Sequence, residues 1–161
     1  MKQKRILFLA SALLLSFTET LFAQGSNRGT ASTDQRRLKI TLDGKQVITA
    51  TLANSPLVDE FITKLPLTLN MTDYLQREKH GGLSFSLSQR NLTNVQKEYA
   101  IGDIIYYPPG PTFAMYYAHD GRVISAGMEV LARLDAEGIR TLATFPANVQ
   151  VMVELASNLS N

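Results

Sequence analysis

The sequence predicts a mainly β fold, a closed antiparallel β-barrel of about eight strands with one or two short helices. Three observations lead to this prediction. Short segments with apolar residues at every second position recur along the chain. Glycine, proline and aspartate clusters separate these segments. A single stripe of apolar residues has clear helical spacing, between Leu57 and Leu65. Many short strands with few helices are typical of a barrel closed on itself.

The stretch from Gly102 to Tyr117 predicts the centre of the fold. Two apolar, aromatic-rich strands are joined by the turn Pro108-Pro109-Gly110-Pro111, which cannot continue either strand. A second turn signal, His119-Asp120-Gly121, leads to another apolar run over residues 123–126. The pattern predicts three successive antiparallel strands, a meander.

A hairpin and a helix are predicted before this centre. Apolar residues alternate over 38–42 and again over 48–52, with Asp43-Gly44 between them. We favour a three-residue loop over 42–44, with Gly44 left-handed and Leu38 opposite Ile48, because it keeps one apolar face. Asn54-Ser55-Pro56 supplies a capping side chain and a first-turn proline, and predicts a helix that ends at Pro66.

The remaining segments differ in the clarity of their pattern. Alternation predicts strands over 67–73, 128–134 and 149–153, and Asp135 can cap a short helix over 136–144. Residues 76–94 are polar and glycine-rich, so we expect a loop there, interrupted by a short strand over 83–87.

The N-terminus predicts export. Lys2, Lys4 and Arg5 precede an apolar run over 6–17, which favours a secretory signal peptide over residues 1–23, with cleavage after Ala23, over an uncleaved membrane anchor. Residues 24–36 are rich in small polar residues and predict a flexible tether, so the barrel domain is expected over residues 37–157. The protein is then periplasmic or secreted, with no stable membrane span after signal removal.

Composition excludes several classes of function. Apolar residues form 45% of the 161-residue chain and charged residues 19%, which is typical of a globular domain. Removal of the predicted signal leaves equal numbers of cationic and anionic side chains, so we expect no nucleic-acid partner. The chain has no cysteine, and so neither disulfides nor lipid attachment through a cysteine.

Three parts of the chain together resemble the bacterial cyclophilin-like family. They are Ile40 to Gly44 leading through Asn54-Ser55-Pro56 to Leu67, then Glu78-Lys79 after Asp73, and finally Gly102 to Tyr107 with Phe113 to Tyr117 and Asp120 to Ile124. The resemblance implies a reduced version of the eight-stranded cyclophilin barrel. It does not extend to the chemistry of the isomerase cyclophilins, whose arginine in a Phe-His-Arg context has no counterpart here.

No catalytic, metal or cofactor site can be assigned from the residues. His80 and His119 are the two histidines, and neither belongs to a short ligand spacing. The arginines available to polarise a proline amide are Arg77, Arg90 and Arg122, and each is expected to be a solvated charge in a polar turn. We therefore predict neither a cofactor nor isomerase activity.

The candidate ligand-binding residues are Tyr74, Glu78, Lys79, Tyr107 and Phe113. The rigid Pro108–Pro111 turn holds two aromatic strand ends, and Glu78-Lys79 beside two glycines can supply polar contacts at the same barrel mouth. Structural packing of the aromatics and a solvated Glu78-Lys79 pair are the alternatives.

Three functions remain open at this point. The first is a non-catalytic module that binds a peptide or small organic ligand. The second is a weak prolyl isomerase or another enzyme, and the third is an accessory subunit that contacts a protein partner. The sequence leaves the oligomeric state open.

Overall fold

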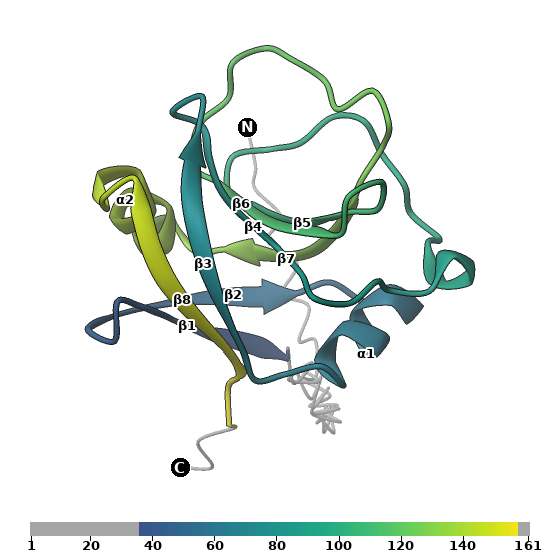
Figure 1. Cartoon of the computed structure of the whole chain (residues 1–161), viewed down its shortest axis with the longest axis horizontal. Coiled ribbons are helices and arrows are strands. Elements are labelled where there is room, and N and C mark those ends of the chain that lie inside the picture. The colour runs from purple at the N-terminus through teal and green to yellow at the C-terminus, as the bar shows by residue number, and fades with distance from the viewer. Residues whose placement is uncertain (1–35, 158–161) are drawn as a thin grey trace, which may run out of the picture. The chain divides into compact units, whose positions relative to one another are not determined.

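A computed structural model describes residues 36–157, and within them the chain forms a closed antiparallel barrel of eight strands (Figure 1). The prediction of a closed barrel with one or two short helices is confirmed, and the helices are two. The elements in chain order are β1 (Arg37–Leu42), β2 (Gln46–Leu52), α1 (Pro56–Ile62), β3 (Leu67–Tyr74), β4 (Glu78–Gly82), the 3-10 turn η1 (Gln89–Asn91), β5 (Asp103–Tyr107), β6 (Thr112–Tyr116), β7 (Glu129–Leu134), α2 (Ala136–Thr144) and β8 (Asn148–Leu155).

The strands close in the order β1-β2-β7-β5-β6-β4-β3-β8, and β8 pairs with β1. The β1–β2 hairpin has one apolar face, as expected, but its register differs from the predicted one. Ile40, not Leu38, lies opposite Ile48, and the three-residue loop covers 43–45. Asp43 takes a positive φ of 47° beside Gly44 at 66°, so two left-handed residues in succession turn the chain.

Side-chain caps start both helices where the sequence predicts them. The Ser55 hydroxyl accepts a hydrogen bond from the Val58 amide at 3.3 Å, and the Asp135 carboxylate accepts one from Gly138 at 2.7 Å. The helices lie at opposite ends of the barrel, α1 where β2 ends and α2 between β7 and β8 (Figure 1).

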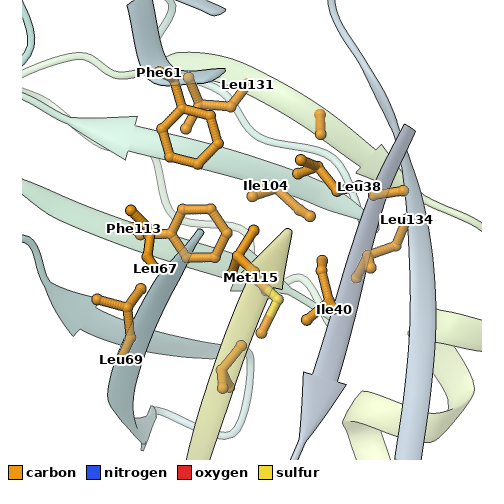
Figure 2. Close-up of a cluster of buried hydrophobic side chains, with 14 of the residues drawn as sticks. Leu38, Ile40, Phe61, Leu67, Leu69, Ile104, Phe113, Met115, Leu131 and Leu134 are labelled. Atoms are coloured by element: carbon orange, nitrogen blue, oxygen red, sulfur yellow. The ribbon is translucent and has the colours of Figure 1, made fainter. Parts of the chain in front are cut away.

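Inward-facing residues from the strands fill the barrel, and α1 adds to them (Figure 2). Phe61 of α1 stacks on Phe113 of β6, with ring centroids 5.9 Å apart and planes at 14°. Burial of these apolar side chains stabilises the barrel, and the described residues form no disulfide. Labelled in Figure 2 are Leu38, Ile40, Phe61, Leu67, Leu69, Ile104, Phe113, Met115, Leu131 and Leu134.

Three expectations about the loops are wrong. Residues 78–82, expected in a loop, form β4, which pairs with β3 on one side and β6 on the other. Residues 83–87 and 123–126, expected as strands, are not in strands. In the first segment Leu83, Phe85 and Leu87 are half-buried or buried without a neighbouring strand to pair with, whereas in the second only Ile124 is half-buried and Val123 is 55% exposed.

Buried and half-buried acceptors hold the long connection between β4 and β5 in place. The Glu60 carboxylate accepts hydrogen bonds from the Ser88 amide and the Asn91 side chain. The Glu129 carboxylate accepts hydrogen bonds from the backbone amides of residues 93 and 94. The Tyr106 hydroxyl accepts one from the backbone amide of residue 87. These hydrogen bonds therefore fix a connection whose one regular element among the described residues is η1.

The predicted signal peptide and nearly all of the predicted tether lie outside the described residues. Among residues 36–157, no helix has the length and apolar character needed to span a membrane.

Candidate functional site

A cavity of about 380 Å³ lies against the outer face of β4, β5 and β6. Side chains alternate along these strands, so Tyr106 and Phe113 point into the barrel core while Ile105, Tyr107 and Ala114 face the cavity. The segment 123–126 forms the opposite wall. The cavity is lined by Tyr74, Arg77, Glu78, His80, Ile105, Tyr107, Thr112, Ala114, Tyr116, Val123, Ile124, Ser125 and Ala126.

Backbone hydrogen bonds join the second half of the segment between β6 and β7 to the connection between β4 and β5. The Ile124 amide donates to the Lys97 carbonyl at 2.7 Å, and Met128 pairs with Gln96 through two backbone hydrogen bonds. A second apolar cluster lies beneath it, separate from the barrel core. Its buried members are Tyr99, Ile105, Ala114, Tyr116 and Met128. The expected meander strand is therefore the cover of a cavity.

Arg77, expected to be a solvated charge, is buried beside the cavity with 5% of its surface exposed. Its Nη1 atom donates to both oxygens of Asp120, each at 3.0 Å, and lies 3.3 Å from the Tyr99 hydroxyl. Its guanidinium also lies 5.4–5.8 Å from the ring centroids of Tyr74, Tyr99 and Tyr116. Carboxylate and aromatic partners offset the cost of burying this cation.

Asp120 completes the attachment of the covering segment. Partial burial acts to raise the pKa of this carboxyl, but hydrogen bonds from the Arg122 amide, the Tyr99 hydroxyl and Arg77 outweigh it and lower the pKa to about 2. Asp120 is therefore an anion at neutral pH and holds its segment to β4 through Arg77.

Glu78 faces the cavity from β4, and 9% of its side chain is exposed. Its Oε2 atom lies 3.3 Å from Arg77 Nε, but neither atom makes a hydrogen bond. Burial, followed by the neighbouring Glu78 carboxylate, raises the pKa of Tyr116, which keeps that phenol protonated. Glu78 is thus a nearly buried carboxylate whose Oε2 atom lies against Arg77.

The structure brings three of the five predicted ligand-binding residues to the cavity, namely Tyr74, Glu78 and Tyr107. Phe113 is fully buried in the barrel core and does not reach the cavity. Lys79 also points away from it, with 1% of its side chain exposed. We therefore leave Phe113 and Lys79 out of the site.

Lys79 belongs to a separate buried group at the end of β3. Its Nζ atom lies 3.0 Å from Asp73 Oδ2, and the Tyr117 hydroxyl donates to the same oxygen. Burial acts to raise the pKa of Asp73, but these two hydrogen bonds outweigh it and lower that pKa. Glu78 and Lys79, for which a solvated pair was the alternative, are thus two buried charges on opposite faces of β4, each with its own partner.

Sequence reasoning missed several residues of the site. His80 shares the cavity face of β4 with Glu78, and Ile124, Ser125 and Ala126 form the cover. The two-residue spacing of Glu78 and His80 is a signal that becomes useful once this segment is known to be a strand. The cover has no such signal, because it is positioned by contacts with the distant segment at Gln96 and Lys97.

No group of three or more histidine, aspartate or glutamate side chains within residues 36–157 is arranged to hold a metal ion.

A closed antiparallel barrel of eight strands defines the structural class of this protein. The model of the cyclophilin-like family matches residues 40–154, so the chain belongs to the cyclophilin-like family. This confirms the resemblance seen in the sequence.

Two solved structures share the fold. The hypothetical protein AF2241 from Archaeoglobus fulgidus is 16% identical with a TM-score of 0.60, over 76% of this chain and 95% of that one. McbB, solved in complex with tryptophan, is 13% identical with a TM-score of 0.53, over 77% of this chain and 46% of that one. At this level of identity the likeness concerns the fold alone. No curated protein matches the chain.

Proposed function

We propose that the chain is a non-catalytic binding module that holds a small organic ligand in the cavity beneath residues 123–126. The observation that carries the proposal is the cavity itself, about 380 Å³ in volume and walled by strands on one side and a fixed segment on the other. This volume lies within the range of small-molecule sites, ~300–1,000 Å³. Its lining combines apolar side chains with a few polar groups, which is the usual composition of such sites.

The surroundings of Arg77 favour binding over prolyl isomerisation. An isomerase of this fold family needs a cation that is free to approach the proline amide. Here Asp120 and Tyr99 occupy the Nη1 atom of Arg77, and Glu78 lies next to Nε. Arg122 and Arg90 are exposed and do not line the cavity.

A ligand with an aromatic or apolar body fits the chemistry of the walls. Ile105, Tyr107 and Ala114 face it from the strands, and Ile124 from the cover. The tryptophan complex of McbB concerns another protein with a similar barrel. We take from it the choice of indole as a first probe.

The test is titration of the full-length chain with indole, followed by fluorescence of the probe. The chain has no tryptophan, so the indole signal is free of a protein background. Ala126→Trp places a large ring at the cavity wall, and Ala143→Trp places the same ring on the exposed surface of α2.

The proposal predicts that indole binding is lost in Ala126→Trp and retained in Ala143→Trp. In these two variants indole is followed by ligand-observed nuclear magnetic resonance, because each contains a tryptophan of its own. Equal binding in both variants, or no binding to the unmodified chain, contradicts the proposal.

We also propose that this binding module is exported, because a basic start and an apolar run of signal-peptide length precede the domain. Intact-mass measurement of the exported protein should give a start at or near Gln24. A mature chain that begins at Met1 contradicts the proposal.

A further inference from the structure

We propose that the ligand of this cavity is an organic acid with an aromatic or apolar body, and that its carboxylate binds His80. The inference rests on the proposed function, because it names the chemical class of the ligand for the same cavity. It follows from the position of the imidazole, from its lack of a partner and from the way in which the neighbouring charges are paired.

Strand β4 places His80 at the cavity wall. Side chains alternate along the strand, so His80 faces the cavity while Lys79 points away from it. The residue opposite His80 on β6 is Ala114, which also lines the cavity. A side chain of this size leaves room for a ligand beside the imidazole. The ring of Tyr74 packs against that of His80 at an angle of 62°, with centroids 5.6 Å apart, and helps to orient it.

The imidazole of His80 is available to a ligand. It is half-buried, and within residues 36–157 it forms neither a hydrogen bond nor an ion pair, whereas the ring of His119 accepts a hydrogen bond from the Gly121 amide at 2.9 Å. The fully buried atoms that lack a partner include Oε2 of Glu78 but neither ring nitrogen of His80. Imidazole nitrogens donate and accept hydrogen bonds. A ligand in the cavity can therefore reach a polar group that the protein leaves unused.

The other charged side chains at this end of the cavity are paired with one another. Arg77 lies 3.0 Å from Asp120 and 3.3 Å from Glu78, and Arg122 lies 3.6 Å from Asp120. Two cations therefore balance two anions. The remaining titratable side chains of the lining are phenols, those of Tyr74, Tyr107 and Tyr116. Phenols carry no charge near neutral pH.

His80 can supply the positive charge that an acid requires. Histidine is the residue type that gains a proton between about pH 8 and pH 5. Among the described residues that line the cavity, His80 is thus the one side chain that can acquire an unbalanced charge, and that charge is positive. It compensates a bound carboxylate through a charge-assisted hydrogen bond, whereas a bound cation meets only anions that are already paired. Of the charged ligands, the cavity therefore favours an acid.

The experiment compares three probes that share an indole ring and differ in the end group. They are indole-3-acetate, which is an anion, tryptophol, which is neutral, and tryptamine, which is a cation. Each is titrated at about pH 6 and about pH 8 against the full-length chain, His80→Gln and the control His119→Gln. The control removes the second of the chain's two histidines, which is exposed and does not line the cavity. Probe fluorescence reports binding directly, because the chain has no tryptophan.

Indole-3-acetate should bind about fivefold more tightly at the lower pH, because a charge-assisted hydrogen bond forms when histidine gains its proton. Tryptophol should bind with affinities that agree within about twofold at the two pH values, and tryptamine should bind no more tightly at the lower pH. His80→Gln should remove the pH dependence for indole-3-acetate, and His119→Gln should retain it.

A second measurement needs no variant that could fail to fold. In nuclear magnetic resonance spectra of the unmodified chain, indole-3-acetate should shift the ring-proton signals of His80 and leave those of His119 nearly unchanged. Shifts at His119 alone, or at neither ring, overturn the inference.

Two results separate the inference from the proposed function. Binding of indole-3-acetate that does not change with pH, or a pH dependence that survives His80→Gln, overturns the acid while the cavity remains a binding site. Failure of indole and all three probes to bind overturns the proposed function and the inference with it.

Discussion

Replacement of Arg77 by methionine should cost about 3–5 kcal/mol of the free energy of unfolding, the usual cost of removing one partner of a buried ion pair. Methionine retains most of the side-chain volume but leaves Glu78 without its neighbouring cation, with 9% of that side chain exposed. The covering segment also loses the attachment through Asp120. Urea denaturation followed by circular dichroism measures the change.

A matched control and a double variant make this prediction specific. Arg90→Met removes an exposed arginine from η1 and should change the free energy of unfolding by no more than about 0.5 kcal/mol. Glu78→Gln added to Arg77→Met removes the unpaired charge, so the double variant should be less destabilised than the sum of the two single ones, by about 0.5–3 kcal/mol. An Arg77→Met chain as stable as Arg90→Met would refute the buried ion-pair group.

Three further predictions concern the cavity and its cover. Phe113→Ala should lower the free energy of unfolding by about 3–5 kcal/mol, as truncation of core aromatics does. Tyr107→Ala should lower it much less and should weaken indole binding. Similar losses of stability in the two variants contradict the assignment of Tyr107 to the cavity wall. Proline isomerisation in a test peptide should proceed at its uncatalysed rate, because the guanidinium of Arg77 is bound to Asp120. A several-fold acceleration that is abolished in Arg77→Met would show that this guanidinium is free to act on the proline amide. The stability supplied by Asp120 should be present above about pH 4 and decline as the pH falls from 3.8 towards about 2, because its folded pKa lies below its ordinary value. Urea midpoints at neutral and acidic pH should therefore differ less in Asp120→Asn than in the unmodified chain, and an unchanged difference contradicts the role of this carboxylate.

Local signals were sufficient to predict most of the barrel from the sequence. The caps at Ser55 and Asp135 act within one helical turn, and both helices begin where these residues predict. The alternation over 67–73 and 149–153 reflects strands with one face in the core, and both strands are present. Such features are local, so the sequence contains them in full.

Strand β4 was missed because its stabilising contacts are distant in the sequence. Five successive residues with charges, a histidine and two glycines resemble a loop when read alone. In the barrel, Glu78 has Arg77 and Tyr116 beside it and Lys79 has Asp73, while β3 and β6 supply backbone hydrogen bonds on both sides. Tertiary pairing here outweighs local propensity.

The candidate site was predicted in part for a related reason. Tyr107 could be placed at a strand end because the proline-rich turn follows it directly. Arg77 could not be placed, because its partner Asp120 lies 43 positions further along the chain. Alternation also left open whether Tyr106 or Tyr107 faces the core. The structure places Tyr106 in the core and Tyr107 at the cavity.

Mapping of indole on the isotope-labelled chain by nuclear magnetic resonance tests most directly whether the cavity is a binding site. The expected chemical-shift changes are confined to the cavity walls, at Thr112 and Ala114 on β6 and at Ser125 and Ala126 on the cover, with none on α2 or in the β1–β2 loop. Shifts spread evenly over the barrel surface, or concentrated away from these four residues, would contradict the account.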